Sequence, residues 1–218
     1  MDIKGCSNLF IGGRCITQHL THLLRMKGYA LKRATDFKKM NEIKEKFCYV
    51  SKDLNLEKNI SSETNFLLKT YELPDNMKIN IEKERYEAPE ILFKPHLFGL
   101  SSYGLSDKIF DVLYHKKNEN HVLNCNLLIV GGTSLLPGLS SRIETDLKEI
   151  FCLRSLKGKK EELFKKFRVK IEDPTDRKYS VYKGTSIYSE MINNNPLFWV
   201  EKKEYEEMGV RAFEKLNF

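Results

Sequence analysis

Several signatures of common enzymes and of membrane proteins are absent from this sequence. It contains no GxxxxGK[ST] phosphate loop, no GxGxxG turn, no GxSxG nucleophile elbow and no HExxH pair. No apolar run approaches the ~20 residues that cross a bilayer, and residues 1–10 lack the apolar core of a signal peptide. These absences argue against the loop-type nucleotide enzymes, the serine hydrolases and the zinc proteases. They predict an intracellular protein without a membrane partner.

Cysteine is also scarce, and no CxxC pair occurs among the five cysteines. Scattered cysteines in a chain of 218 residues favour free thiols in a reducing compartment. Cys15, His19 and His22 share one face of a predicted helix, which raises the hypothesis of a metal site. However, Cys15 and His22 would lie ~10.5 Å apart along the helix axis, too far to converge easily on one ion. We therefore expect no metal site.

Positive charge is in excess, with a net charge of +7. Much of it lies in residues 148–170, where apolar residues are interleaved with lysine and arginine. One interpretation is a nucleic-acid surface, whose affinity would fall steeply with salt. The commoner one is a solvated helical face with its apolar residues turned inward, namely Phe151, Leu156, Leu163, Phe164 and Phe167.

Strand and helix signals alternate along the chain, which predicts an α/β core. In the first hundred residues, apolar spacing predicts one helix from Ile16 that Gly28 ends, and a second from about Thr35 to Val50. Residues 51–65 are polar and fit a loop or a short helix. Residues 66–81 fit a hairpin, and Pro89 is placed to begin a short helix.

The second half repeats this alternation. Ser106 is placed to cap a helix over 105–113, and a further helix is expected over 139–150. Leu127 to Val130 is an apolar run that fits a strand buried on both faces. Further strands are expected at 167–171 and 179–182, and short helices from Thr185 to the end, with Gly209 as a helix stop.

The strongest local signal for ligand chemistry is the strand at 127–130 followed by Gly131, Gly132 and Thr133. Glycines at such a turn let a ligand approach the backbone, although most turns of this kind are only tight connections. Lys44 and Glu45 fall on the polar side of the second helix, so spacing alone favours a solvated face. The histidines at 96, 115 and 121 show no acid–base partner nearby in the sequence, and we expect no catalytic residue.

Taken in order, several stretches resemble the actin family over nearly the whole chain. They are Gly12-Gly13-Arg14, residues 44–50 (KEKFCYV), 71–75 (YELPD), 84–95, 130–138 (VGGTSLLPG), 177–181 (RKYSV) and 199–209. Three further stretches are more similar to the actin-related proteins than to conventional actin: 86–97 (YEAPE to PHL), 153–174 with its KIEDP, and 209–216 (GVRAFEKL). The basic segment is thus better explained as a family insertion than as a nucleic-acid site.

This resemblance implies an actin-like and Hsp70-like ATPase-domain fold of the ribonuclease H-like α/β class, of which the chain would form the C-terminal half. The implied parts are an entry strand of the base lobe at 1–11, an inserted subdomain 4-like lobe at 12–100, a subdomain 3-like base lobe at 101–180, and a subdomain 1-like terminal segment at 181–218.

By the same resemblance, the implied cofactor is ATP with magnesium. Lys44 and Glu45 would lie beside the adenine and the ribose, Lys178 would flank the base, and Gly13 would lie near the floor of the cleft. The implied nucleotide-binding set is Gly13, Lys44, Glu45, Gly131, Gly132, Thr133, Leu136 and Lys178. The family's phosphate hairpins and the carboxylate that holds the metal's water shell have no match, so we expect neither a metal ligand nor ATPase activity in this chain.

The chain also departs from the family pattern inside this set. Asn41 stands at an arginine position, Cys15 at an aspartate, and Leu136 at a tyrosine that packs by the base. Lys183-Gly184-Thr185 replaces a glycine pair followed by a small residue. Together these changes predict weak or absent ATP binding.

The function that the resemblance implies is that of a cytoskeletal, cytoplasmic subunit. Its partners would be actin and the other subunits of a complex that nucleates branched actin filaments, with no nucleic acid and no membrane. The alternatives are conventional actin, a nuclear actin-related protein of a chromatin complex, an ATPase of the same fold, and a half-length paralogue that binds no nucleotide.

Overall fold

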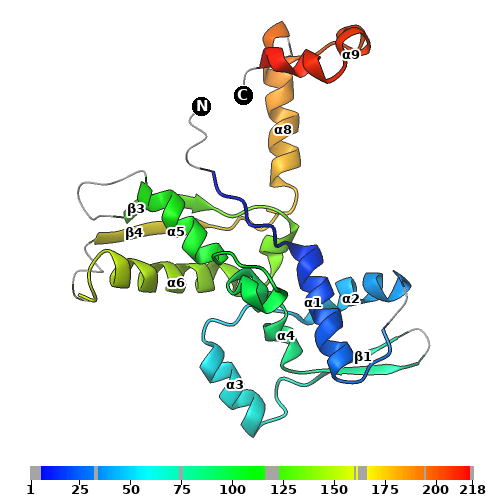
Figure 1. The fold of residues 1–218 in the computed structure, drawn as a ribbon, viewed down its shortest axis with the longest axis vertical. Coiled ribbons are helices and arrows are strands. Elements are labelled where there is room, and N and C mark those ends of the chain that lie inside the picture. The colour runs from blue at the N-terminus through cyan, green and yellow to red at the C-terminus, as the bar shows by residue number, and fades with distance from the viewer. Residues whose placement is uncertain are drawn as a thin grey trace.

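The structure is a computed structural model that describes residues 6–31, 34–73, 76–115, 123–159, 161, 166–193 and 195–216. It mixes helices with two small sheets, as the α/β prediction requires. Figure 1 shows a body from which a helical arm, here defined as residues 180–216, rises to one side. The body is built from two groups of elements, which follow one another in the chain.

The first group begins with two packed helices. Helix α1 (Gly13–Met26) buries Ile16, Leu20 and Leu24, and α2 (Ala34–Phe47) buries Met40 and Ile43. Both were predicted. Gly28 follows α1 with φ +101, a conformation that strongly favours glycine, so it ends the helix as expected.

The rest of the first group is short elements. Helix α3 (Leu54–Glu63) is capped by Asp53, whose carboxylate accepts from two backbone N–H groups. The predicted hairpin is confirmed as antiparallel β1 (Lys69–Glu72) and β2 (Lys78–Ile81), but turn residues 74 and 75 lie outside the described residues. Helix α4 (Glu84–Glu87) and the 3₁₀ helices η2 (Pro89–Leu92) and η3 (Pro95–Phe98) follow, with Pro89 at the start of η2 as predicted.

The second group places two helices beside a parallel strand pair (Figure 1). Its elements are α5 (Leu105–His115), β3 (Leu123–Leu128), η4 (Gly132–Leu135), α6 (Leu139–Arg154) and β4 (Phe167–Glu172). In the parallel register Leu123 lies opposite Phe167. Phe151 and Leu156 are buried, as expected for inward-facing residues of the basic segment, whereas residues 163 and 164 lie outside the described residues.

Two predictions in this second group were wrong. The strand near 127–130 is not buried on both faces: Leu128 is 59% exposed and Val130 38%, and burial alternates along β3 and β4. Among the described residues, α5 and α6 cover one face of this strand pair and no element covers the other. Ser106 lies within α5 and donates to Asp146 Oδ2 at 3.0 Å, so its hydroxyl bonds across to α6 and does not cap its own helix.

A buried ion network joins the two groups of elements. The guanidinium of Arg142 on α6 binds both carboxylate oxygens of Glu90 at 3.1 Å, Asp146 at 2.8 Å and the carbonyl of Ser51 at 2.9 Å. We call Arg142, Glu90 and Asp146 the junction network. Next to it, Val50 N–H donates to the carbonyl of Pro137 at 2.8 Å. These bonds fix α6 and the turn before it against the first group.

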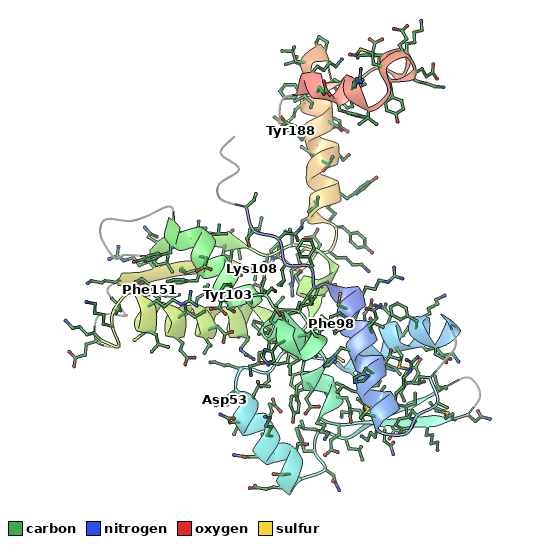
Figure 2. The ribbon with its side chains drawn as sticks, viewed as in Figure 1. Asp53, Phe98, Tyr103, Lys108, Phe151 and Tyr188 are labelled. Atoms are coloured by element: carbon green, nitrogen blue, oxygen red, sulfur yellow. The ribbon has the colours of Figure 1, made fainter. Side chains whose placement is uncertain are left out.

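The arm consists of α8 (Ser180–Met191), η6 (Pro196–Phe198), α9 (Lys202–Met208) and η7 (Gly209–Leu216). The strand predicted at 179–182 was wrong, because α8 begins at Ser180. No residue of α8 is buried, and Figure 2 shows Tyr188 on this helix well away from the body. Short helices from Thr185 onward and the stop at Gly209 agree with the prediction.

Candidate functional site

A cavity of about 690 Å³ opens where the N-terminus of α1, the inner face of α2 and the turn after β3 meet. Its volume falls within the range of small-molecule sites. The lining residues are Gly13, Arg14, Ile16, Phe37, Asn41, Lys44, Glu45, Gly132, Thr133, Leu135, Leu136 and Lys178. They come from four separate stretches of the chain, so the fold, and not a contiguous motif, builds the site.

The structure brings the predicted nucleotide-binding residues together with one exception. Gly13, Lys44, Glu45, Gly132, Thr133, Leu136 and Lys178 all line the cavity. Gly131 does not line it. The Gly131 N–H donates to the carbonyl of Arg177 at 2.9 Å, so this group is engaged within the protein. With φ +98, Gly131 shapes the turn that presents its neighbours.

Gly13 is where the two walls of the cavity touch. Its N–H donates to Thr133 Oγ1 at 3.1 Å, and its carbonyl accepts from Lys44 Nζ at 3.2 Å. A Cβ at this position would lie 3.0 Å from Thr133 Oγ1 and 3.4 Å from Lys44 Nζ. Glycine is therefore the residue that fits this close approach without displacing a wall.

Lys44 is buried, with only 8% of its surface exposed, which corrects the solvated face that spacing alone favoured. The start of α1 covers this side of α2, a tertiary contact that helical spacing does not reveal. Burial lowers the pKa of Lys44, and the nearby Glu45 carboxylate opposes that shift. Glu45 itself is exposed at the cavity, as the polar face predicted.

Asn41 lies one helical turn before Lys44 and Glu45 on α2 and hydrogen-bonds to both side chains. Its Oδ1 accepts from Lys44 Nζ at 2.7 Å and from Thr17 Oγ1 at 3.3 Å, and its Nδ2 donates to Glu45 Oε1 at 2.8 Å. In the sequence, Asn41 stood out only as a departure from the family pattern. The hydrogen bonds that join Asn41 to Lys44 and Glu45 were not predicted.

Four other lining residues were missed by sequence reasoning: Arg14, Ile16, Phe37 and Leu135. Arg14 lies over the ring of Phe37, 5.8 Å from its centroid, in a cation–π contact at the edge of the site. The available signal was Gly13 next to Arg14, and for Leu135 its place within the VGGTSLLPG stretch. Ile16 and Phe37 looked like ordinary members of apolar helical stripes.

His19 and His22, which raised the metal hypothesis, pack against aromatic rings instead. His19 is 9% exposed, stacks on His22 at 6.4 Å and meets Phe98 edge-on. Burial, followed by the charge of His22, lowers the pKa of His19. Among the described residues, no group of three or more histidine, cysteine or acidic side chains is placed to hold a metal ion. Within the same part of the chain, no helix is both long and apolar enough to span a membrane.

Comparison with known proteins identifies the family. The actin family model matches residues 4–217. Actin-related protein 2 of Schizosaccharomyces pombe is 42% identical over 96% of this chain and 54% of its own length. The proteins of that name from Acanthamoeba castellanii and Arabidopsis thaliana are 39% and 37% identical, over 95% of this chain and 53% of theirs. The chain thus spans about half the length of these curated relatives. It belongs to the actin family and is similar to its actin-related protein 2 members.

Proposed function

We propose that this chain is a cytoskeletal actin-related protein that acts as a subunit of the actin-related protein 2/3 complex, which nucleates branched actin filaments in the cytoplasm. The support is the identity of 37–42% to proteins named actin-related protein 2, spread over 95–96% of the chain. Its partners would be actin and the other subunits of the complex. In that role the chain contributes a surface that imitates part of a filament end.

Co-purification tests the assembly proposal. The chain would be expressed with the other subunits of the complex, and the expected result is that it elutes with them in size-exclusion chromatography. A matched control is the chain shortened after Tyr179, which lacks the exposed apolar arm. If the full chain elutes alone under these conditions, the assembly proposal is wrong for this chain.

We also propose that the cavity at the start of α1 binds the nucleoside part of ATP. The observation that carries this is the convergence of Gly13, Lys44, Thr133 and Lys178, from distant parts of the chain, around one cavity. Leu135 and Leu136 supply an apolar surface for a base, and Lys44 and Glu45 supply polar contacts. These residues therefore suit the adenine and ribose end of ATP.

The cavity has few groups that could hold magnesium or promote ATP hydrolysis. Glu45 is the single carboxylate that lines it among the described residues, whereas Mg²⁺ is usually held by carboxylates together with substrate phosphates. No histidine lines it in the same part of the chain, so the candidates for a general base are Glu45 and Lys44. We propose that the chain alone binds a nucleoside weakly and does not turn over ATP.

Titration calorimetry with adenosine and with ATP tests the binding proposal. We expect at best high-micromolar dissociation constants, because phosphate contacts supply much of the affinity in nucleotide sites. Lys44→Ala should abolish the signal, whereas Lys38→Ala, at an exposed position of α2 outside the cavity, should preserve it. Binding that survives Lys44→Ala would refute the assigned cavity, and magnesium-dependent phosphate release above a boiled control would refute the absence of turnover.

A further inference from the structure

Asn41 occupies an unusual position in the cavity, because both ends of its side-chain amide are engaged with neighbouring polar groups. Oδ1 faces Lys44 Nζ and Thr17 Oγ1, and Nδ2 faces Glu45 Oε1. The reverse amide orientation would place an NH₂ against an ammonium and an oxygen against a carboxylate. The charges on either side therefore determine this orientation.

These bonds limit what Lys44 and Glu45 can offer to a ligand. The Lys44 ammonium has three N–H groups, and two are used by the carbonyl of Gly13 at 3.2 Å and by Asn41 at 2.7 Å. One carboxylate oxygen of Glu45 is held by Asn41 at 2.8 Å. Within the described part of the chain, one N–H of Lys44 and one oxygen of Glu45 are left to serve the cavity.

We propose that Asn41 is the positioning residue of this cavity, which holds Lys44 as a single donor and Glu45 as a single acceptor side by side. The inference rests on the proposed nucleoside binding and adds a residue that acts through Lys44 and Glu45. The ligand chemistry that such a pair recognises is an acceptor next to a donor, as on a sugar diol or the edge of a nucleobase.

A purely structural role for Asn41 is distinguishable from this one. The residue lies inside α2, where asparagine has a lower helix propensity than leucine. Asn41→Leu removes both hydrogen-bonding ends and favours the helix, so the fold should be kept. Asn41→Asp keeps the acceptor for Lys44 but replaces the donor to Glu45 with a like charge.

Several charged and titratable groups surround Lys44. Glu45 and Cys48 lie on its own helix, Arg14 comes from α1, and Lys178 precedes α8. Oδ1 of Asn41 accepts from the ammonium and stabilises the charged form of Lys44. Loss of this acceptor should lower the pKa of Lys44 further, and an aspartate in its place should raise it.

The experiment measures two quantities on the full chain and on Asn41→Leu, Asn41→Asp and Asn59→Leu, the last at an exposed asparagine of α3. One is the dissociation constant for adenosine. The other is the rate of amine labelling at Lys44 against pH, followed by peptide mass spectrometry. Thermal melting confirms that each variant is folded.

We expect Asn41→Leu to weaken adenosine binding by about tenfold or more, since bonds to charged groups are involved. Its Lys44 labelling profile should move to lower pH, and that of Asn41→Asp to higher pH, while Asn59→Leu matches the parent. Parent-like binding and labelling in Asn41→Leu would overturn the positioning role. If the parent does not bind adenosine but the labelling profiles move as expected, nucleoside binding fails and the positioning of Lys44 stands.

Discussion

At the scale of single residues, the close contact at Gly13 sets the shape of the cavity. A Cβ there would press on Thr133 Oγ1 at 3.0 Å and approach Lys44 Nζ at 3.4 Å, and both are atoms of opposite walls. Space is the constraint at Gly13, because its φ lies outside the left-handed region reported for Gly28 and Gly131. The neighbouring side chains, not the local backbone conformation, make the position sensitive.

We therefore predict that Gly13→Ala weakens adenosine binding and destabilises the fold by about 1–3 kcal/mol, the usual range for overpacking. Gly184→Ala is the matched control, because Gly184 lies within α8 with no heavy atom within 4 Å of an added Cβ. Alanine there should leave stability unchanged or raise it by about 0.5–1 kcal/mol. Urea denaturation measures both variants, and equal effects at the two sites would contradict the role assigned to Gly13.

At the scale of elements, the junction network decides how α6 is held against the first group. Arg142 is 8% exposed and Glu90 4%, so removal of the guanidinium leaves a buried carboxylate with fewer partners. Lys94, which binds Glu90 Oε1 at 3.2 Å, is 45% exposed at its side chain and compensates in part. Breaking such a buried pair is far more costly than losing a surface pair.

Arg142→Met should accordingly destabilise the protein by about 3–5 kcal/mol. Arg154→Met, on the same helix, removes exposed ion pairs to Asp107 and Asp111 and should cost less than about 1 kcal/mol. The double variant Arg142→Met with Glu90→Gln should recover part of the loss, because the carboxylate charge is gone. Similar melting temperatures for the two arginine variants would show that the junction network contributes little.

Elements with local signals were predicted well from the sequence. The apolar spacing of α1 and α2, the glycine after α1 and the proline at the start of η2 each act within a few residues. The errors arose where distant partners decide the structure. Val181 and Tyr182 favour strands by propensity, yet they form part of α8. Leu128 was predicted in a strand buried on both faces, but among the described residues helices cover one face of that strand.

In the candidate site, too, local signals were predicted and the effects of distant residues were not. The family resemblance located Lys44, Thr133 and Lys178, and the fold brings them to one cavity. Spacing alone assigned Lys44 to solvent, because the helix that buries it lies more than ten residues away in the chain. The two-sided bonding of Asn41 depends on the exact placement of Thr17 and Glu45, which only the packed structure supplies.

At the scale of the whole molecule, the arm exposes a large apolar surface. Val181, Tyr182, Ile187 and Met191 of α8 are each more than 60% exposed, and Figure 1 shows the arm projecting from the body. Leu197 and Val210 near its end are 73% and 75% exposed. Apolar surface of this extent is rare on monomeric soluble proteins and marks a contact surface.

We predict that the full chain associates with itself or with chaperones when it is expressed alone. A shortened chain that ends at Tyr179 should be more soluble, since burial is worth ~25 cal/mol per Å² of apolar area and half of the large apolar side chains exposed in the described residues belong to the arm. Static light scattering on the two proteins over a concentration series measures the difference. A full chain that stays monomeric, with no gain in solubility on shortening, would contradict this expectation.

Arg177, just before the arm, is tied to the glycine turn beside the cavity. The guanidinium of Arg177 donates to the carbonyl of Ser134 at 3.1 Å, and the Arg177 carbonyl accepts from Gly131 N–H at 2.9 Å. Gly132 and Thr133, which lie between those two positions, line the cavity. Arg177, three residues before the arm, thus holds both ends of the turn whose two middle residues line the cavity. A displacement of the base of the arm would therefore reach the cavity through this turn.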